Sequence, residues 1–156
     1  MMRISPYLDK DCIKIPLENE KKHHIIQELL DLITEKYDEV DQEITLQSLL
    51  EREKIETTGI GENVAIPHAR IKKIQKVYFA FGIAQKGVEF DSLDQRPVRL
   101  VFLILCPEKK VNTQIGLLAR LSRFVHDKRL RKKLLKCQNS QDVIRVFTKY
   151  EDKHFS

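Results

Sequence analysis

The chain has 156 residues, of which 42% are hydrophobic and 33% charged, and its formal net charge is +5. The length favours one globular domain over residues 1–156 with a core at about residues 10–150, and the composition excludes a disordered or collagen-like chain. No apolar run approaches the ~20 residues that cross a bilayer, and the N-terminus lacks the apolar core of a signal peptide. We therefore expect a cytoplasmic protein without a membrane segment.

The first half of the chain predicts two helices. Residues 21–36 place their apolar side chains at helical spacing behind Asn19, which we expect to cap the helix. A shorter helix is predicted near residues 45–53, and it ends in the charged run Glu51-Arg52-Glu53. Arg52 is therefore expected next to the loop that follows.

Three apolar stretches then predict strands, and the rest of the chain is helical. The strands are expected at residues 64–66, 77–84 and 98–105, with turns at Gly87 and at residues 91–97. The third stretch is apolar with little alternation, which indicates burial on both faces of a sheet. Helices are predicted over residues 113–125 and 127–136 and from Ser140 onward. This order indicates an α/β domain, with α+β as the alternative, in which helices flank a small mixed sheet.

The basic charge is concentrated in residues 117–136, which hold eight Lys or Arg and one Asp. This segment has a net charge of +7, which leaves −2 for the rest of the chain. Its apolar residues recur at helical spacing, so two amphipathic helices with solvated charged faces are the favoured interpretation. A docking surface for an acidic protein or for nucleic acid is the alternative. Because the segment has no recognised nucleic-acid motif, we do not expect nucleic acid as a partner.

Cysteines and scattered histidines give no pattern of a disulfide framework, a metal site or a cofactor. Three cysteines without close pairing predict neither disulfides nor a CxxC motif. His23 and His24 are adjacent on a helix and point about 100° apart, so they do not form a chelating pair. His126 is expected at a helix junction and His154 in a frayed terminus. We therefore expect no metal and no cofactor.

The segment from Thr57 to Arg70 carries the chemistry that the sequence predicts. Pro67 fixes its own φ and favours an extended Ile66, so the backbone that leads to His68 is stiff. A neutral imidazole is a usable nucleophile near pH 7, because its unperturbed pKa is about 6.5. Taken alone, however, a histidine after a strand is more often structural than catalytic.

Residues around His68 offer the donors that a phosphorylated imidazole needs. Backbone N–H groups at glycines, threonine hydroxyls and an arginine side chain can all bind phosphate oxygens. The candidates are Gly59, Gly61, Thr57, Thr58, Arg52 and Arg70. The loop is not a nucleotide P-loop, because no Gly-Lys-Ser/Thr follows the glycines.

The run Thr-Gly-x-Gly-x-x-x-Ala-Ile-Pro-His-Ala resembles the phosphorylation-site signature of the enzyme IIA family of the phosphoenolpyruvate-dependent phosphotransferase system, in its mannitol/fructose/nitrogen branch. Two further features resemble that family: Arg52 sixteen residues before His68, and the Leu-Leu-Ala-Arg-Leu-Ser run that begins at Leu117. The resemblance covers roughly residues 10–150. It implies that His68 accepts a phosphoryl group and that Arg52 lies near it.

The resemblance also implies partners. An upstream carrier, HPr or an analogue, would donate to His68, which would pass the group to an enzyme IIB on another chain. The stand-alone form resembles the nitrogen-related branch, which implies a second function: a regulatory protein-binding module that phosphorylation of His68 switches, without sugar transport.

One position departs from the family pattern. The family usually has a second active-site histidine at the position of Gln114. A glutamine amide can donate a hydrogen bond to a phosphoryl oxygen, but it does not titrate near neutral pH or carry positive charge. We therefore expect a shifted pH dependence or a slower transfer.

Overall fold

The computed structural model describes residues 2–155. Within them lie five α-helices: α1 (Lys22–Lys36), α2 (Gln42–Ile55), α3 (Val111–Val125), α4 (Lys128–Leu135) and α5 (Ser140–Phe155). The same residues form six strands: β1 (Ile13–Lys14), β2 (Gly59–Gly61), β3 (Val64–Ala65), β4 (His68–Ile71), β5 (Tyr78–Val88) and β6 (Val98–Pro107). Two short 3₁₀ turns, η1 (Ser5–Tyr7) and η2 (Lys10–Cys12), precede β1.

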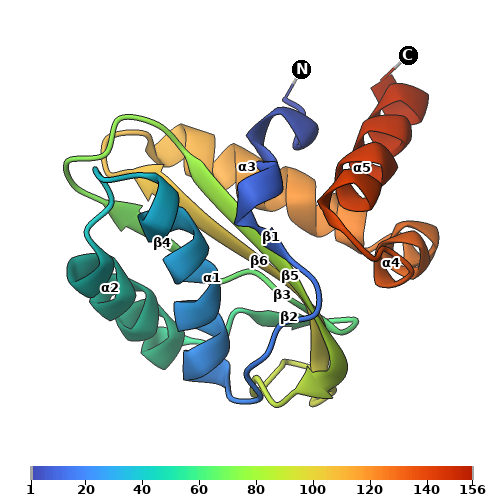
Figure 1. Cartoon of the computed structure of the whole chain (residues 1–156), viewed down its shortest axis with the longest axis horizontal. Coiled ribbons are helices and arrows are strands. Elements are labelled where there is room, and N and C mark those ends of the chain that lie inside the picture. The colour runs from blue at the N-terminus through green and yellow to red at the C-terminus, as the bar shows by residue number, and fades with distance from the viewer. Residues whose placement is uncertain (1, 156) are drawn as a thin grey trace.

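The strands form one mixed sheet in the order β1-β5-β6-β3-β2, and β4 also pairs with β6. β5 runs antiparallel to β6, whereas β3 and β4 run parallel to it. Helices α1 and α2 pack on one face of the sheet, and α3, α4 and α5 pack on the other (Figure 1). This three-layer arrangement confirms the predicted fold, a small mixed sheet flanked by helices.

The two long central strands divide the core into two parts. Along β5 and β6 successive side chains alternate between the faces, so Phe81 and Phe102 join the α3–α5 side while Ala80 and Leu103 join the α1–α2 side. From Leu100 to Cys106 every residue of β6 is fully buried. The prediction of a strand buried on both faces is therefore confirmed.

Helices α3 and α4 confirm the amphipathic pattern of the basic segment. Leu117 and Leu121 of α3 and Leu130 and Leu134 of α4 are fully buried, while most of the lysines and arginines are exposed. Arg131 differs, because it donates to Glu62 and to two backbone carbonyls. No helix within residues 2–155 has both the length and the apolar character needed to cross a bilayer.

Some element boundaries differ from the sequence prediction. Asn19 does not cap α1; the N-cap is Lys21, and the Asn19 amide donates instead to Glu28. Helix α2 is longer than predicted because Asp41 caps it, accepting a hydrogen bond from the backbone N–H of Ile44. Two more residues at the other end, Lys54 and Ile55, place Arg52 within the last turn of α2 rather than next to its end.

Two further local predictions were wrong, and one strand at the site was not predicted. Gly87 is not a turn between strands; it lies inside β5, with a φ of 83°, where the pairing with β6 is irregular. His154 is not in a frayed terminus, because α5 continues to Phe155 and the imidazole stacks on the ring of Tyr150 at 4.1 Å. Strand β4, which begins at His68, has no counterpart among the predicted strands.

Candidate functional site

His68 begins strand β4, which follows a break between two segments that both pair with β6. Strand β3 pairs with β6 beside Leu100 and Val101, and β4 pairs with it beside residues 104–107. Between β3 and β4 the chain passes through Ile66 and Pro67, and the Pro67 carbonyl accepts from the N–H of Ile104. Because Pro67 fixes φ and has no N–H, it separates β3 from β4, while the pairing of β4 with β6 anchors His68.

The imidazole of His68 has one defined hydrogen bond. Its Nδ1 atom lies 2.7 Å from the carbonyl oxygen of Ile66. A carbonyl oxygen only accepts, so Nδ1 carries the proton when the ring is neutral. The lone pair of the neutral ring is then on Nε2.

The surroundings of His68 favour this neutral form. Burial is the largest cause that lowers the pKa of His68 below its usual 6.5, and the positive charge of Arg52 lowers it further. The hydrogen bond to Ile66 and the carboxylate of Glu53 act in the opposite direction but do not reverse the shift. Near pH 7 the ring is therefore an uncharged nucleophile with Nε2 unprotonated.

His68 lines an open cavity of about 340 Å³ between α2, β4 and the start of α3. The ring is half-buried, so it is neither sealed in apolar packing nor fully exposed. The lining residues are Ser48, Glu51, Arg52, Ile55, His68, Ala69, Arg70 and Gln114. Three residues far apart in the sequence, Arg52, His68 and Gln114, thus meet at one cavity.

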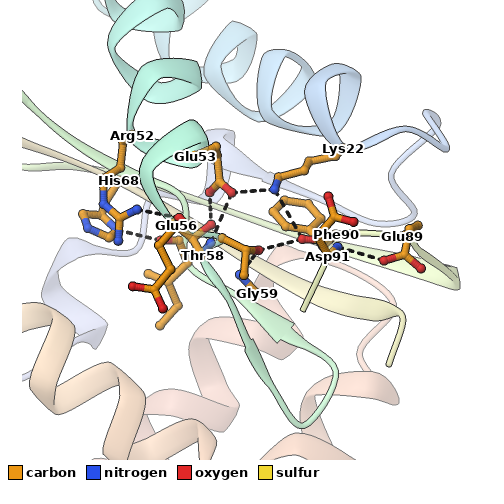
Figure 2. Close-up of polar contacts among 12 residues, drawn as sticks. Lys22, Arg52, Glu53, Glu56, Thr58, Gly59, His68, Glu89, Phe90 and Asp91 are labelled. Carbon is orange, nitrogen blue, oxygen red and sulfur yellow. Dashed lines mark hydrogen bonds and ion pairs between the residues drawn. The ribbon is translucent and has the colours of Figure 1, made fainter. Parts of the chain in front are cut away.

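Arg52 reaches this cavity from the last turn of α2. Its Nη1 atom donates to the carbonyl of Glu56 at 2.6 Å, and its guanidinium lies beside the His68 ring (Figure 2). The other N–H groups of the guanidinium have no hydrogen-bond partner among residues 2–155 and are free to bind an anion. Gln114 is buried in the first part of α3, where its side chain also borders the cavity.

The threonines and glycines of the sequence motif lie elsewhere. The Thr57 hydroxyl donates to the carbonyl of Phe90 at 2.6 Å and accepts from the N–H of Gly59. The Thr58 hydroxyl donates to Glu53, so both hydroxyls have partners within the fold.

The two glycines are required by close packing at Gly59 and by the backbone conformation at Gly61. A Cβ at Gly59 would lie 2.5 Å from the Ser92 hydroxyl, and Gly61 has a φ of 98° beside Asp94. None of the four residues of the Thr57-Thr58-Gly59-x-Gly61 segment is among the lining residues of the His68 cavity. The structure therefore brings Arg52, Arg70 and Gln114 to His68, and not this segment.

Sequence reasoning missed two residues that matter to the site. Ser48 lines the cavity, and its position one helical turn before Arg52 was the available signal. Glu53 is buried and bonds to Thr58, whereas the sequence shows it only as one charge in a charged run. Among residues 2–155 no group of three or more His, Cys, Asp or Glu side chains is placed to hold a metal ion.

Comparison with known proteins identifies the family. Residues 6–150 match the model of the family described as "Phosphoenolpyruvate-dependent sugar phosphotransferase system, EIIA 2". The chain is 33% identical over 150 residues to the fructose-specific EIIABC component of Bacillus subtilis, covering 96% of this chain but only 24% of that protein. It is 32% identical to a nitrogen regulatory protein of Bradyrhizobium diazoefficiens and 36% identical to a fructose-specific EIIA component of Haloferax volcanii. These two matches cover 93% and 90% of this chain and 94% and 91% of the relatives.

Solved structures agree in fold. The nitrogen regulatory protein IIA-Ntr of Neisseria meningitidis superposes with a TM-score of 0.85 at 26% identity, covering 92% of this chain and 97% of that one. Enzyme IIA mannitol of Escherichia coli, in its complex with phosphorylated enzyme IIB mannitol, has a TM-score of 0.77 at 22% identity, covering 90% and 96%. The chain therefore belongs to the EIIA 2 family of the phosphoenolpyruvate-dependent sugar phosphotransferase system and is a phosphocarrier component of that system.

Proposed function

We propose that His68 is the residue on which this phosphocarrier receives a phosphoryl group and from which it passes the group on. The observation that carries the proposal is the Nδ1–H···O=C bond to Ile66, which leaves the lone pair on Nε2 in a cavity that also holds a guanidinium. The proposal includes the whole chain acting as one domain. It also includes a cytoplasmic location.

The chemical step follows from the tautomer. The lone pair of His68 Nε2 attacks the phosphorus of the donor's phosphohistidine, and the P–N bond to the donor breaks as its imidazole leaves with the electron pair. Nδ1 keeps its proton and its bond to Ile66, so the phosphorylated ring carries a positive charge. That charge makes the ring a good leaving group, which suits a carrier that must release the phosphoryl group to an acceptor.

Arg52 and Gln114 supply the electrostatic support. Charge-assisted bonds from a guanidinium to phosphoryl oxygens are about twice as strong as neutral ones, and the free N–H groups of Arg52 are available for them. The Gln114 amide can donate a further hydrogen bond without adding charge. Thr57, Thr58, Gly59 and Gly61 have no part in this proposal, because none of them lines the cavity and both threonine hydroxyls bond within the fold.

We propose an HPr-like phosphocarrier as the donor and an enzyme IIB as the acceptor. The support for an acceptor of this kind is the neighbour of the same fold that forms a complex with phosphorylated enzyme IIB. A second candidate is a regulatory protein whose partner binding depends on the phosphorylation of His68. The relative named a nitrogen regulatory protein, which matches along 93% of this chain, favours this second candidate.

Incubation with phosphoenolpyruvate, enzyme I and HPr, followed by mass mapping of the modified residue, tests the proposal. We expect one added phosphoryl group on the peptide that contains His68, and none in the His68→Ala variant. The matched control is His126→Ala, which removes an exposed histidine outside the cavity and should be labelled like the wild type. Acid-labile phosphate on the His68→Ala protein would show that the site is wrong.

Single-turnover transfer separates the two candidate functions. Phosphorylated wild-type protein mixed with a purified enzyme IIB should lose its phosphoryl group to IIB if the chain serves sugar transport. Labelling of His68 without transfer to any IIB tested favours the regulatory function.

A further inference from the structure

A buried ion pair joins α1 to α2 behind the site. The ammonium of Lys22 lies 2.8 Å from Glu53 Oε2, and the two side chains are 15% and 3% exposed. Lys22 also donates to the carbonyl of Phe90 at 3.3 Å, with its ammonium over the Phe90 ring. Figure 2 shows Lys22 on the opposite side of Glu53 from Arg52 and His68. Neither residue lines the His68 cavity, so neither touches a group bound there.

From Glu53 a continuous hydrogen-bond path leads to the imidazole. The Glu53 carboxylate accepts from both the hydroxyl and the N–H of Thr58, the latter at 3.1 Å. The Thr58 carbonyl accepts from the N–H of Ile66 at 2.9 Å, and the Ile66 carbonyl accepts from Nδ1 of His68 at 2.7 Å. Direct polar contacts thus link Lys22 to Glu53, Glu53 to Thr58, Thr58 to Ile66 and Ile66 to the ring, and the backbones of Thr58 and Ile66 connect them.

The same carboxylate also fixes the helix turn that carries Arg52. Glu53 follows Arg52 directly in α2, and its side chain is held by Lys22 on one side and Thr58 on the other. Since one helix turn moves as a unit, holding Glu53 limits where the Arg52 guanidinium can lie. The Lys22–Glu53 ion pair is therefore connected both to the His68 ring and to the helix turn that carries Arg52.

We propose that Lys22 and Glu53 are positioning residues that hold His68 as the Nδ1–H tautomer and hold Arg52 beside it. This inference rests on the proposed function for its role in phosphoryl transfer. A buried ion pair contributes little net stability compared with apolar packing, so stability alone does not account for a lysine and a glutamate here. Losing the pair frees Thr58 and the Ile66 carbonyl to shift. The ring then also samples the tautomer in which Nε2 is protonated and cannot attack.

The test compares Lys22→Met with the conservative Lys22→Arg and with the matched control Lys21→Met. Lys21 is the exposed neighbour and loses the same charge. Two quantities are measured: the tautomer of His68 by ¹⁵N NMR of the imidazole, and kcat and KM for phosphorylation by phosphorylated HPr.

For Lys22→Met we expect a mixture of tautomers and a kcat lower by about 10-fold with KM unchanged, which is the lower end of the loss seen when the hydrogen-bond partners of metal-binding histidines are removed. Lys22→Arg should restore a single Nδ1–H tautomer and most of kcat, and Lys21→Met should match the wild type. A folded Lys22→Met protein with a single Nδ1–H tautomer and wild-type kcat would overturn the proposal.

Glu53→Gln serves as the second variant should Lys22→Met fail to fold. It keeps the shape of the side chain but accepts fewer hydrogen bonds from Thr58, so it should shift the tautomer in the same direction. An unchanged tautomer in folded Glu53→Gln contradicts the proposal equally. The NMR measurement of the tautomer needs no phosphate. If the wild-type protein could not be phosphorylated, the proposed function would be wrong, and the tautomers of the variants would still decide whether Lys22 and Glu53 position the ring.

Discussion

Two short segments of one motif, residues 57–61 and residues 66–70, have opposite relations to the site. In the first, the hydroxyls of Thr57 and Thr58 bond to Phe90 and Glu53 within the fold. In the second, His68 lines the cavity with Nε2 open, and Arg70 is exposed beside it. Residues 57–61 therefore support the position of residues 66–70 from within the fold. A motif can therefore be continuous in sequence and still divide into a part that supports and a part that lines the cavity.

Among the variants that test this comparison, Arg52→Met is expected to have the largest effect on the transfer rate. Removing one preorganised donor to a developing anion costs about 10²–10³-fold in rate, and Arg52 is the cation beside the ring. We expect the rate of His68 phosphorylation by phosphorylated HPr to fall by about 10²-fold, measured by rapid quench.

Lys54→Met is the matched control for Arg52. Lys54 is exposed two residues later in α2, outside the cavity, and loses the same charge. If the two variants slow transfer equally, the effect of Arg52 is one of overall charge and the proposed contact is wrong.

A smaller effect, on stability rather than on transfer, is expected for Thr57→Val. The change keeps the side-chain shape but removes the hydroxyl that bonds to Phe90 and Gly59, which should lower the free energy of unfolding by about 1–2 kcal/mol. Urea denaturation measures the loss of stability. The transfer rate should stay within about twofold of the wild type, whereas a loss of ~1.4 kcal/mol in activation free energy would slow it tenfold. A large loss of transfer rate in a stable Thr57→Val protein would place the first segment in the site after all.

The smallest change is expected for Gln114→His, and it is seen best in the pH profile. Burial lowers the pKa of His68 below 6.5, so its neutral form persists at that pH, and the wild-type rate should begin to fall only at lower pH. A second imidazole in the cavity adds a group that gains a proton and a positive charge as the pH falls, which a glutamine amide cannot do. The variant should keep or raise the rate at pH 7 and become pH-dependent where the wild type is flat. Identical profiles for the two proteins would mean that residue 114 does not act on the transferred group.

Much of the fold could be predicted from the sequence because apolar spacing records which face of each element is buried. The helices, the doubly buried strand β6 and the amphipathic basic segment all follow from that spacing. Strand β4 could not be predicted, because its four residues alternate buried and exposed over too short a length, and only pairing with β6 makes them a strand.

The site was predictable only in part, for a physical reason. His68 and Arg52 could be named because the Ala-Ile-Pro-His-Ala run and the spacing of Arg52 resemble the family signature; side-chain chemistry alone left His68 as one candidate. Whether a threonine hydroxyl faces a ligand or a buried carboxylate depends on tertiary contacts, and the partner of Thr58 is Glu53 across the α2–β2 turn. Similarly, the orientation of the His68 ring depends on the Ile66 carbonyl, which no side-chain pattern reveals.

The most direct test of this account is ¹⁵N NMR of the histidine rings of the protein before and after phosphorylation. We predict that His68 begins as the Nδ1–H tautomer and that phosphorus becomes bonded to its Nε2, visible as a ¹⁵N–³¹P coupling at that nitrogen. Phosphorus on Nδ1 of His68, or on any other histidine, would contradict it.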